Sequence, residues 1–195
     1  MKFTASNDHW ADTTPFRFNY DRTQRALHWS MATMIFVAIA LGIWASYLER
    51  GSALKDLLLL IHKSLGLTVL ILVIFRLAYR WLVGEPPYRQ PLGKLIYTVR
   101  SAVHVLIYLL MIFMPVTGYI FSGAAGRSLP FFGLFEWPQI VPKDKMLSQL
   151  GGSFHYWGAW VICIALTVHV TAVAWHRWIR KDDVLVRMLR PRLSI

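Results

Sequence analysis

Histidine is the residue type of this 195-residue chain whose placement suggests chemistry. Six of the seven histidines lie in or at the ends of long apolar runs, and these are His28, His62, His104, His155, His169 and His176. Ionisable side chains inside membrane-length apolar segments are rare, and they usually serve a cofactor, an ion or a substrate. One such histidine could simply cap a helix or contact a lipid headgroup. Six of them, distributed over every apolar run, indicate a functional set.

The spacing of two of these histidines indicates the kind of site. His155 and His169 are 14 residues apart, which in an α-helix is about 21 Å along the axis and within about 40° of one face. Such a spacing stacks two sites across a bilayer, one near each surface. Two imidazoles from facing helices, one on each side of an iron, can hold a low-spin b haem that only transfers electrons. Hydrolytic zinc or iron sites fit less well, because no carboxylate lies inside the apolar runs.

Four apolar runs must position these side chains. They cover residues 26–48, 57–83, 102–121 and 154–179. Each is long enough to cross a hydrocarbon core that needs about 20 helical residues, and lipid leaves a helix as the only plausible form. The fold class predicted is therefore all-α, an integral membrane four-helix bundle. Pro115 should kink the third helix, and the long loop over 122–152 should fold as a cap near the interface.

The basic residues predict an orientation. The net charge is +11, but its Lys and Arg residues cluster between the apolar runs. With the N-terminus inside, the inner side collects 15 of them and the outer side 6, so both termini should be cytoplasmic. We therefore divide the chain into a polar cytoplasmic tail over 1–24, a transmembrane domain over 25–181 and a basic cytoplasmic tail over 182–195. A topology signal of this kind makes nucleic acid a poor partner.

Depth then sorts the histidines. His62 and His155 are the only ones near the outer surface, so they form one natural pair. The inner surface has four candidate ligands, namely His28, His104, His169 and His176, and spacing alone does not decide between them.

Several short motifs carry a family resemblance. They are RALHW (25–29), IHKSLG (61–66), HVLIYLL (104–110), PVTGY (115–119), FHYWGAW (154–160) and VHVTAVAWHRWIRKDDVLVRM (168–188). Together they resemble the bacterial cytochrome b561 family, multi-pass inner-membrane proteins that hold two haem b groups in four helices. The resemblance implies the axial pairs His28 with His169 and His62 with His155. It also implies an oxidoreductase that oxidises superoxide and reduces ubiquinone.

The resemblance leaves other residues with supporting roles. His104, His176 and Arg76 are then candidates for contact with haem propionates or a quinone, since a histidine can exchange a proton and an arginine can bind a carboxylate. Lys63 could help to steer an anion such as superoxide toward the outer haem.

Small residues and an alternative function complete the predictions. Gly42 and Gly66 could let a flat macrocycle or a neighbouring helix approach closely.

The alternative function is a membrane-anchor electron-transfer subunit, serving a separate dehydrogenase or a periplasmic redox partner, with the long outer loop as its docking surface. In either case the chain's environment is the lipid bilayer of a bacterial inner membrane.

Overall fold

The computed structural model of the protein describes residues 18–88 and 93–190. Three segments lie outside this part: residues 1–17 of the predicted N-terminal tail, residues 89–92, and residues 191–195 of the predicted C-terminal tail.

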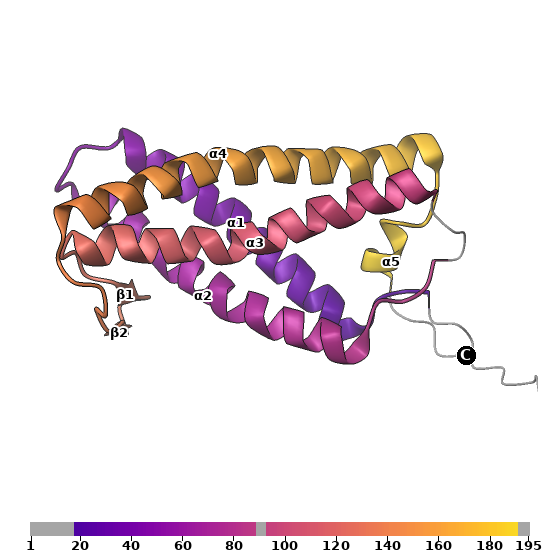
Figure 1. The fold of residues 1–195 in the computed structure, drawn as a ribbon, viewed down its shortest axis with the longest axis horizontal. Coiled ribbons are helices and arrows are strands. Elements are labelled where there is room, and N and C mark those ends of the chain that lie inside the picture. Colours follow the sequence, from indigo (N-terminus) through magenta and orange to yellow (C-terminus); the bar gives the residue numbers. More distant parts are fainter. Residues whose placement is uncertain (1–17, 89–92, 191–195) are drawn as a thin grey trace, which may run out of the picture.

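Four long helices make up most of the described chain (Figure 1). They are α1 (Arg22–Tyr47), α2 (Ala53–Val83), α3 (Lys94–Ala124) and α4 (Lys145–Trp175). All four are long and apolar enough to cross a membrane, which confirms the predicted class of an integral membrane four-helix bundle. The smaller elements are a π-helical turn (His176–Arg180), the one-turn helix α5 (Val186–Leu189) and a hairpin of β1 (Pro130–Phe131) and β2 (Phe135–Glu136).

All four long helices begin earlier than the predicted spans, and polar side chains cap the starts of α1, α2 and α4. Asp21 accepts a hydrogen bond from the amide of Gln24 at the start of α1, and Asp144 accepts one from the amide of Leu147 at the start of α4. α4 therefore begins at Lys145 rather than 154, whereas α3 begins at Lys94 rather than 102, directly after Gly93 and without a side-chain cap. The apolar runs mark the part of each helix that suits lipid, whereas caps and glycines set the true ends.

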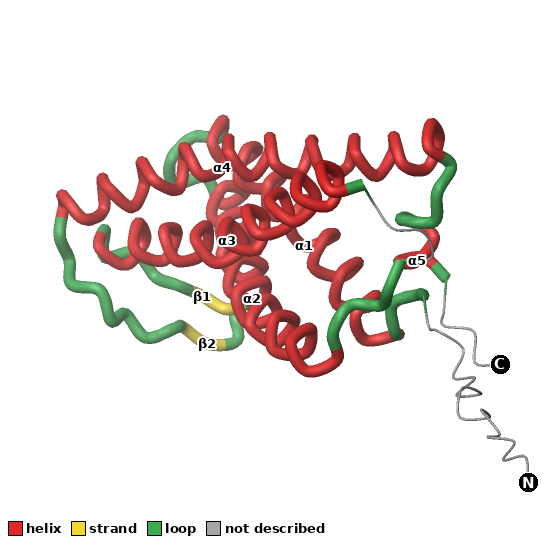
Figure 2. The backbone as a smooth tube through the Cα atoms, turned by 45° about the vertical axis from the view of Figure 1, so that its right-hand side comes forward, coloured by secondary structure: helices red, strands yellow, loops and turns green. Residues whose placement is uncertain are grey.

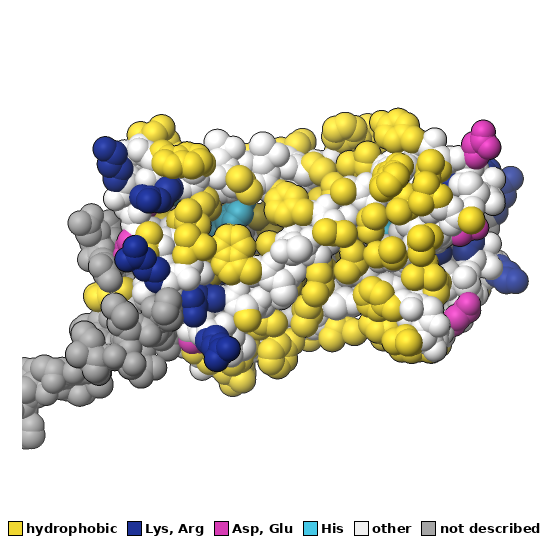
Figure 3. Space-filling model, turned by 180° about the vertical axis from the view of Figure 1, so that it is seen from behind, with side chains coloured by type: hydrophobic (Ala, Val, Ile, Leu, Met, Phe, Trp, Pro, Cys, Tyr) yellow, Lys and Arg dark blue, Asp and Glu magenta, His cyan; other side chains and the backbone are white. Residues whose placement is uncertain are grey.

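The apolar core lies midway along the bundle. Buried side chains from all four helices meet there, and they are Met31, Ile35, Val69, Val73, Leu110, Met111, Ile162 and Ala165. Large apolar side chains also cover the outside of the bundle, whereas charged side chains gather at its two ends (Figure 3). This distribution is the one expected for a protein whose solvent along its sides is lipid.

Glycines let α3 and α4 pack closely, as small residues commonly do between membrane helices. A Cβ at Gly158 would lie 2.6 Å from Sδ of Met114, and one at Gly151 would lie 2.9 Å from the backbone nitrogen of Phe121. α3 also remains one helix through Pro115.

The two ends of the bundle differ, and we name them by their small elements (Figure 2). The hairpin end carries β1 and β2, with the side chain of Ser64 in α2 accepting a hydrogen bond from the amide of Phe132. The α5 end carries α5, which folds back beside the start of α1, where the amide of Tyr20 donates to the carbonyl of Arg187. Both described ends of the chain therefore lie at one end of the bundle.

Candidate functional site

One pair of histidines lies toward the hairpin end. His62 of α2 and His155 of α4 have ring centroids 5.9 Å apart and ring planes 82° apart. Nδ1 of His62 is 2.8 Å from the carbonyl oxygen of Ala38, and Nδ1 of His155 is 3.0 Å from that of Met114. A carbonyl only accepts, so both Nδ1 atoms donate and each Nε2 keeps its lone pair. Histidines that bind a metal are usually held in this way.

Two glycines give these rings their space. A Cβ at Gly42 of α1 would lie 3.0 Å from Cε1 of His62, and one at Gly118 of α3 would lie 3.1 Å from Cε1 of His155. These separations are shorter than nine in ten contacts of real Cβ atoms, so each ring occupies volume that a larger residue would need. Gly66 differs, because its Cβ would meet only Cβ of Pro115 at 3.9 Å. Of the two glycines noted in the sequence, only Gly42 lies against an imidazole.

Three histidines meet toward the α5 end. His169 of α4 has its ring centroid 6.4 Å from that of His28 in α1 and 5.1 Å from that of His104 in α3. Nδ1 of His104 bonds to the carbonyl oxygen of Arg100 at 2.7 Å, one turn earlier in the same helix. This group contains three of the four inner candidates identified in the sequence.

Ring separation tests whether an iron with two axial imidazoles fits these positions. A bond from a metal to an imidazole nitrogen is about 2 Å long, so two rings on opposite sides of one haem iron have centroids roughly 6 Å apart. The 5.9 Å between His62 and His155 and the 6.4 Å between His28 and His169 fit this requirement. The 5.1 Å between His104 and His169 is too short for it.

Arg76 lies within the α5-end group. Its Nη2 atom is 3.1 Å from Nδ1 of His28, and its Nε donates to the hydroxyl of Tyr108 at 3.0 Å. The Arg76 side chain therefore places a positive charge beside the His28 and His169 pair. A small cavity borders it, and its lining includes Gln24 and Arg80.

His176 does not join this group. It follows α4 in the π-helical turn and is buried, with Nδ1 2.5 Å from a carboxylate oxygen of Asp182. Seven residues separate it from His169, which is about 10 Å along a helix.

Basic side chains near the hairpin end are engaged with the loop. Nζ of Lys63 donates to the carbonyl oxygen of Ser128 at 2.9 Å, and the guanidinium of Arg127 lies 4.5 Å from the ring centroid of Phe121. Lys63 directly follows His62 in α2, and its side chain is half-buried. Lys63 thus lies beside the His62 and His155 pair, and Arg127 lies at the same end of the bundle, in the loop that carries the hairpin.

Sequence reasoning missed three residues of these sites. Gly118 and Thr117 border His155, with Oγ1 of Thr117 3.3 Å from Nδ1 of the ring. Tyr108 holds Arg76. Gly118 and Tyr108 were visible within the motifs PVTGY and HVLIYLL, but only the packing of α3 on its neighbours reveals their roles.

Comparison with known proteins shows the family of the chain. Residues 19–191 match the family model of prokaryotic cytochrome b561. Cytochrome b561 homolog 2 of Escherichia coli (strain K12) is 29% identical over 90% of this chain and 93% of the relative. Cytochrome b561 homolog 1 of the same organism is 25% identical over 89% and 98% of the two chains. A Yersinia pestis protein named probable superoxide oxidase CybB is 26% identical over 87% and 95%.

The family match spans the four long helices and all of the histidine motifs. Four membrane-crossing helices together with bacterial relatives of this kind make the protein a multi-pass protein of the bacterial inner membrane. They confirm the resemblance drawn from the sequence, and with it an electron-transfer role in the membrane. The chain belongs to the prokaryotic cytochrome b561 family.

Proposed function

We propose that this protein takes electrons from superoxide at the hairpin end, carries them across the membrane and delivers them to a quinone at the α5 end. The observation that supports this most is the pair of imidazole sites toward opposite ends of one bundle, His62 with His155 and His28 with His169. When bound between such pairs, haem b supplies one-electron transfer without an open coordination position. Backbone carbonyls orient the rings of His62 and His155, and Gly42 and Gly118 leave the space that these rings occupy.

The reaction balances with one quinone for two superoxide ions. Each superoxide gives up one electron and leaves as O₂, while the quinone takes two electrons and two protons to become a quinol. The excess of Lys and Arg at the α5 end supports a cytoplasmic location for it, which puts the hairpin end in the periplasm. Lys63 and Arg127 near the hairpin-end pair would attract an anionic donor. The name of the Yersinia relative supports superoxide as that anion.

At the α5 end, Arg76 and Tyr108 would hold a haem propionate, because a guanidinium binds a carboxylate through charge-assisted hydrogen bonds. His104 would keep its ring against His169 through its bond to Arg100. The quinone would lie at this end of the bundle, where His176 is a candidate proton donor.

Kinetics with purified, haem-loaded protein tests the proposal. Rapid mixing with superoxide should reduce the haems, and adding a short-chain quinone should reoxidise them with formation of quinol. Absence of b-type haem bands, or no haem reduction by superoxide, would contradict it.

A second candidate function is supported by the exposed apolar side chains of the hairpin region. Leu134 and Ile140 are 79% and 82% exposed, and Phe135 is 51% exposed. Such a surface could dock a periplasmic redox protein, and the chain would then act as its membrane electron-transfer subunit. Haems that are reduced by such a protein but not by superoxide would favour this function over the first.

A further inference from the structure

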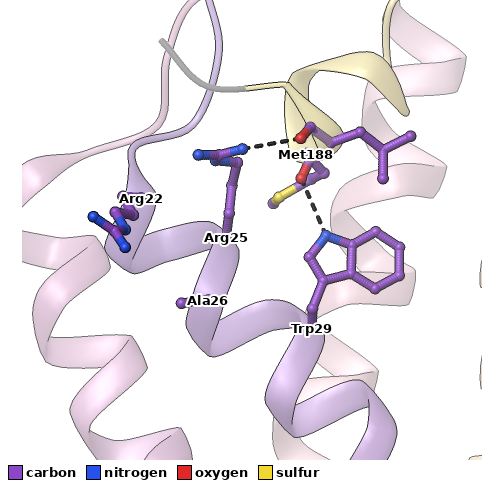
Figure 4. Close-up of a pocket in the computed structure, with 6 residues that line it drawn as sticks. Arg22, Arg25, Ala26, Trp29 and Met188 are labelled. Carbon is purple, nitrogen blue, oxygen red and sulfur yellow. Dashed lines mark hydrogen bonds between the residues drawn. The ribbon is translucent and has the colours of Figure 1, made fainter.

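Beside His28, whose ring centroid is 5.1 Å from that of Trp29, α1 and α5 form an open pocket of about 440 Å³ (Figure 4). Its lining consists of Arg22, Arg25, Ala26, Trp29, Met188 and Leu189. None of these residues has a role in the proposed electron transfer, so the pocket needs its own explanation.

The pocket is built by contacts between distant parts of the chain. Nη1 of Arg25 donates to the carbonyl of Leu189 at 2.9 Å, and Nε1 of Trp29 donates to the carbonyl of Met188 at 3.1 Å. These two bonds, drawn in Figure 4, hold α5 against α1 as a wall of the pocket. α5 is too short to be a stable helix alone, so its position here depends on contacts with other parts of the chain, and Arg25 and Trp29 supply two of them.

The arginines leave donors available for an anion. Nε of Arg25 is buried and has no hydrogen-bond partner within the described part of the chain. Arg22 lies one turn earlier and is exposed. Residues three apart on a helix have Cβ atoms about 5–6 Å apart, so both guanidinium groups can reach one ligand. A buried donor without a partner is costly, and a bound anion would satisfy it.

The position of the pocket indicates what the anion is attached to. It lies at the first turns of α1, where this membrane-crossing helix begins at the α5 end. Phosphate groups of lipids occur at this depth, and basic pockets at the cytoplasmic ends of membrane helices suit anionic headgroups. Ala26 and Trp29 are exposed and continue the pocket along α1 toward the apolar region, where an acyl chain can lie.

We propose that this pocket binds the phosphate of an anionic phospholipid, with Arg22 and Arg25 as its ligands and Trp29 and Ala26 beside its acyl chain. Two guanidinium groups favour an anion over a neutral quinone. The proposal does not rest on the proposed electron transfer, because none of the four candidate haem ligands lines the pocket.

Lipid binding to the full-length, haem-loaded protein in detergent tests the proposal, measured by native mass spectrometry with phosphatidylglycerol, cardiolipin or phosphatidylcholine. Anionic lipids should bind and phosphatidylcholine should not. Arg22→Gln should weaken anionic lipid binding about fivefold, the effect expected for one cationic side chain near a membrane surface. Arg25→Lys keeps the charge but loses the guanidinium fork, so it should weaken binding by less. The matched control is Arg177→Gln, an exposed arginine near the same end, which should bind as the unmodified protein does.

Several results would overturn the proposal. Equal losses from Arg22→Gln and Arg177→Gln would show only a general effect of charge. Inorganic phosphate that binds as tightly as the lipids would show a site for a free anion. Displacement of the lipid by a short-chain quinone would show a quinone pocket instead. Arg22 is exposed, so Arg22→Gln should keep the haem spectrum and the thermal unfolding midpoint, which excludes misfolding as the cause of a loss.

Discussion

Arg76 and His28 contact each other through Nη2 and Nδ1, 3.1 Å apart, across the interface of α2 and α1. A guanidinium only donates, so Nδ1 of His28 accepts and the neutral ring carries its proton on Nε2. His62, His155 and His104 show the opposite arrangement, in which Nδ1 faces a backbone carbonyl. If Nε2 of His28 is to bind iron, Arg76 must move away from Nδ1. A haem propionate is the anion that would draw it away.

The charge of Arg76 gives the first prediction. Arg76→Gln should lower the midpoint potential of the α5-end haem, because loss of a nearby positive charge favours the oxidised form. The loss of roughly 1 kcal/mol of charge interaction corresponds to about 40 mV for one electron. Spectroelectrochemical titration measures this, with Arg76→Lys as the charge-preserving control. An equal shift in both haems, or in neither, would contradict a location of Arg76 at one site.

The axial ligands give the second prediction. His62→Ala and His155→Ala should each remove the same haem, and His28→Ala and His169→Ala should each remove the other, because each iron loses one of its two imidazoles. Haem content per chain, together with the difference spectrum, measures the loss. His176→Ala is the matched control and should retain both haems, since this histidine bonds to Asp182 outside the pairs.

His104 provides a contrasting outcome for the same experiment. Its ring is too close to that of His169 for an iron between them, so His104→Ala should retain both haems. Loss of the α5-end haem from His104→Ala, combined with its retention in His28→Ala, would assign the ligand to α3 instead of α1.

The glycines beside the rings give the third prediction. Gly42→Ala and Gly118→Ala should broaden or remove the hairpin-end haem signal, because the new methyl group would lie about 3 Å from His62 or His155 and force the ring out of position. Gly66→Ala is the matched control, since its methyl group would meet Pro115 at an ordinary distance. Low-temperature absorption and electron paramagnetic resonance spectra measure ligand geometry at each haem. Equal spectra for all three variants would show that the rings tolerate the displacement.

Much of this architecture could be predicted from the sequence, because membrane insertion imposes simple constraints. A helix that crosses lipid needs a long apolar run, so each span is visible locally. The 14-residue step from His155 to His169 likewise follows from helix geometry alone. The pairing of His62 with His155 was predicted from their shared depth in the membrane alone, and their ring centroids lie 5.9 Å apart.

Contacts between helices could not be predicted in this way. Gly118 lies against His155, and Tyr108 against Arg76, because of how α3 rotates and packs on its neighbours. No periodic pattern within one helix specifies that rotation. The contact of α5 with Trp29 could not be predicted either, because the basic composition of residues 182–195 is typical of a solvated tail.

Arg187 explains how α5 is held, and it gives the fourth prediction. This arginine is 1% exposed, donates to the carbonyls of Phe18, Pro86 and Pro87, and lies 4.0 Å from the ring centroid of Tyr88. Arg187→Ala should destabilise the protein by about 3 kcal/mol, because it removes charge-assisted hydrogen bonds and leaves buried carbonyls unsatisfied. Thermal unfolding in detergent measures the change.

The control for this prediction is Arg190→Ala, an exposed position three residues later that should change stability by less than about 0.5 kcal/mol. Arg187→Lys should fall between the two, since an ammonium cannot reproduce the guanidinium's geometry. A thermal midpoint that is the same in Arg187→Ala and Arg190→Ala would mean that the α5 end does not contribute to global stability.

The bond between His176 and Asp182 gives the fifth prediction. Nδ1 of His176 lies 2.5 Å from the carboxylate, with Nε of Arg180 3.5 Å from the same oxygen. If His176 donates a proton to the bound quinone, Asp182 orients its ring, and Asp182→Asn should slow quinone reduction on the order of tenfold, as loss of an orienting partner commonly does. Haem content and reduction by superoxide should be unchanged, since these depend on the histidine pairs. Glu49→Gln, at an exposed carboxylate near the hairpin end, is the control. An equal slowing of haem reduction in Asp182→Asn would place its effect before the quinone step and contradict the assignment.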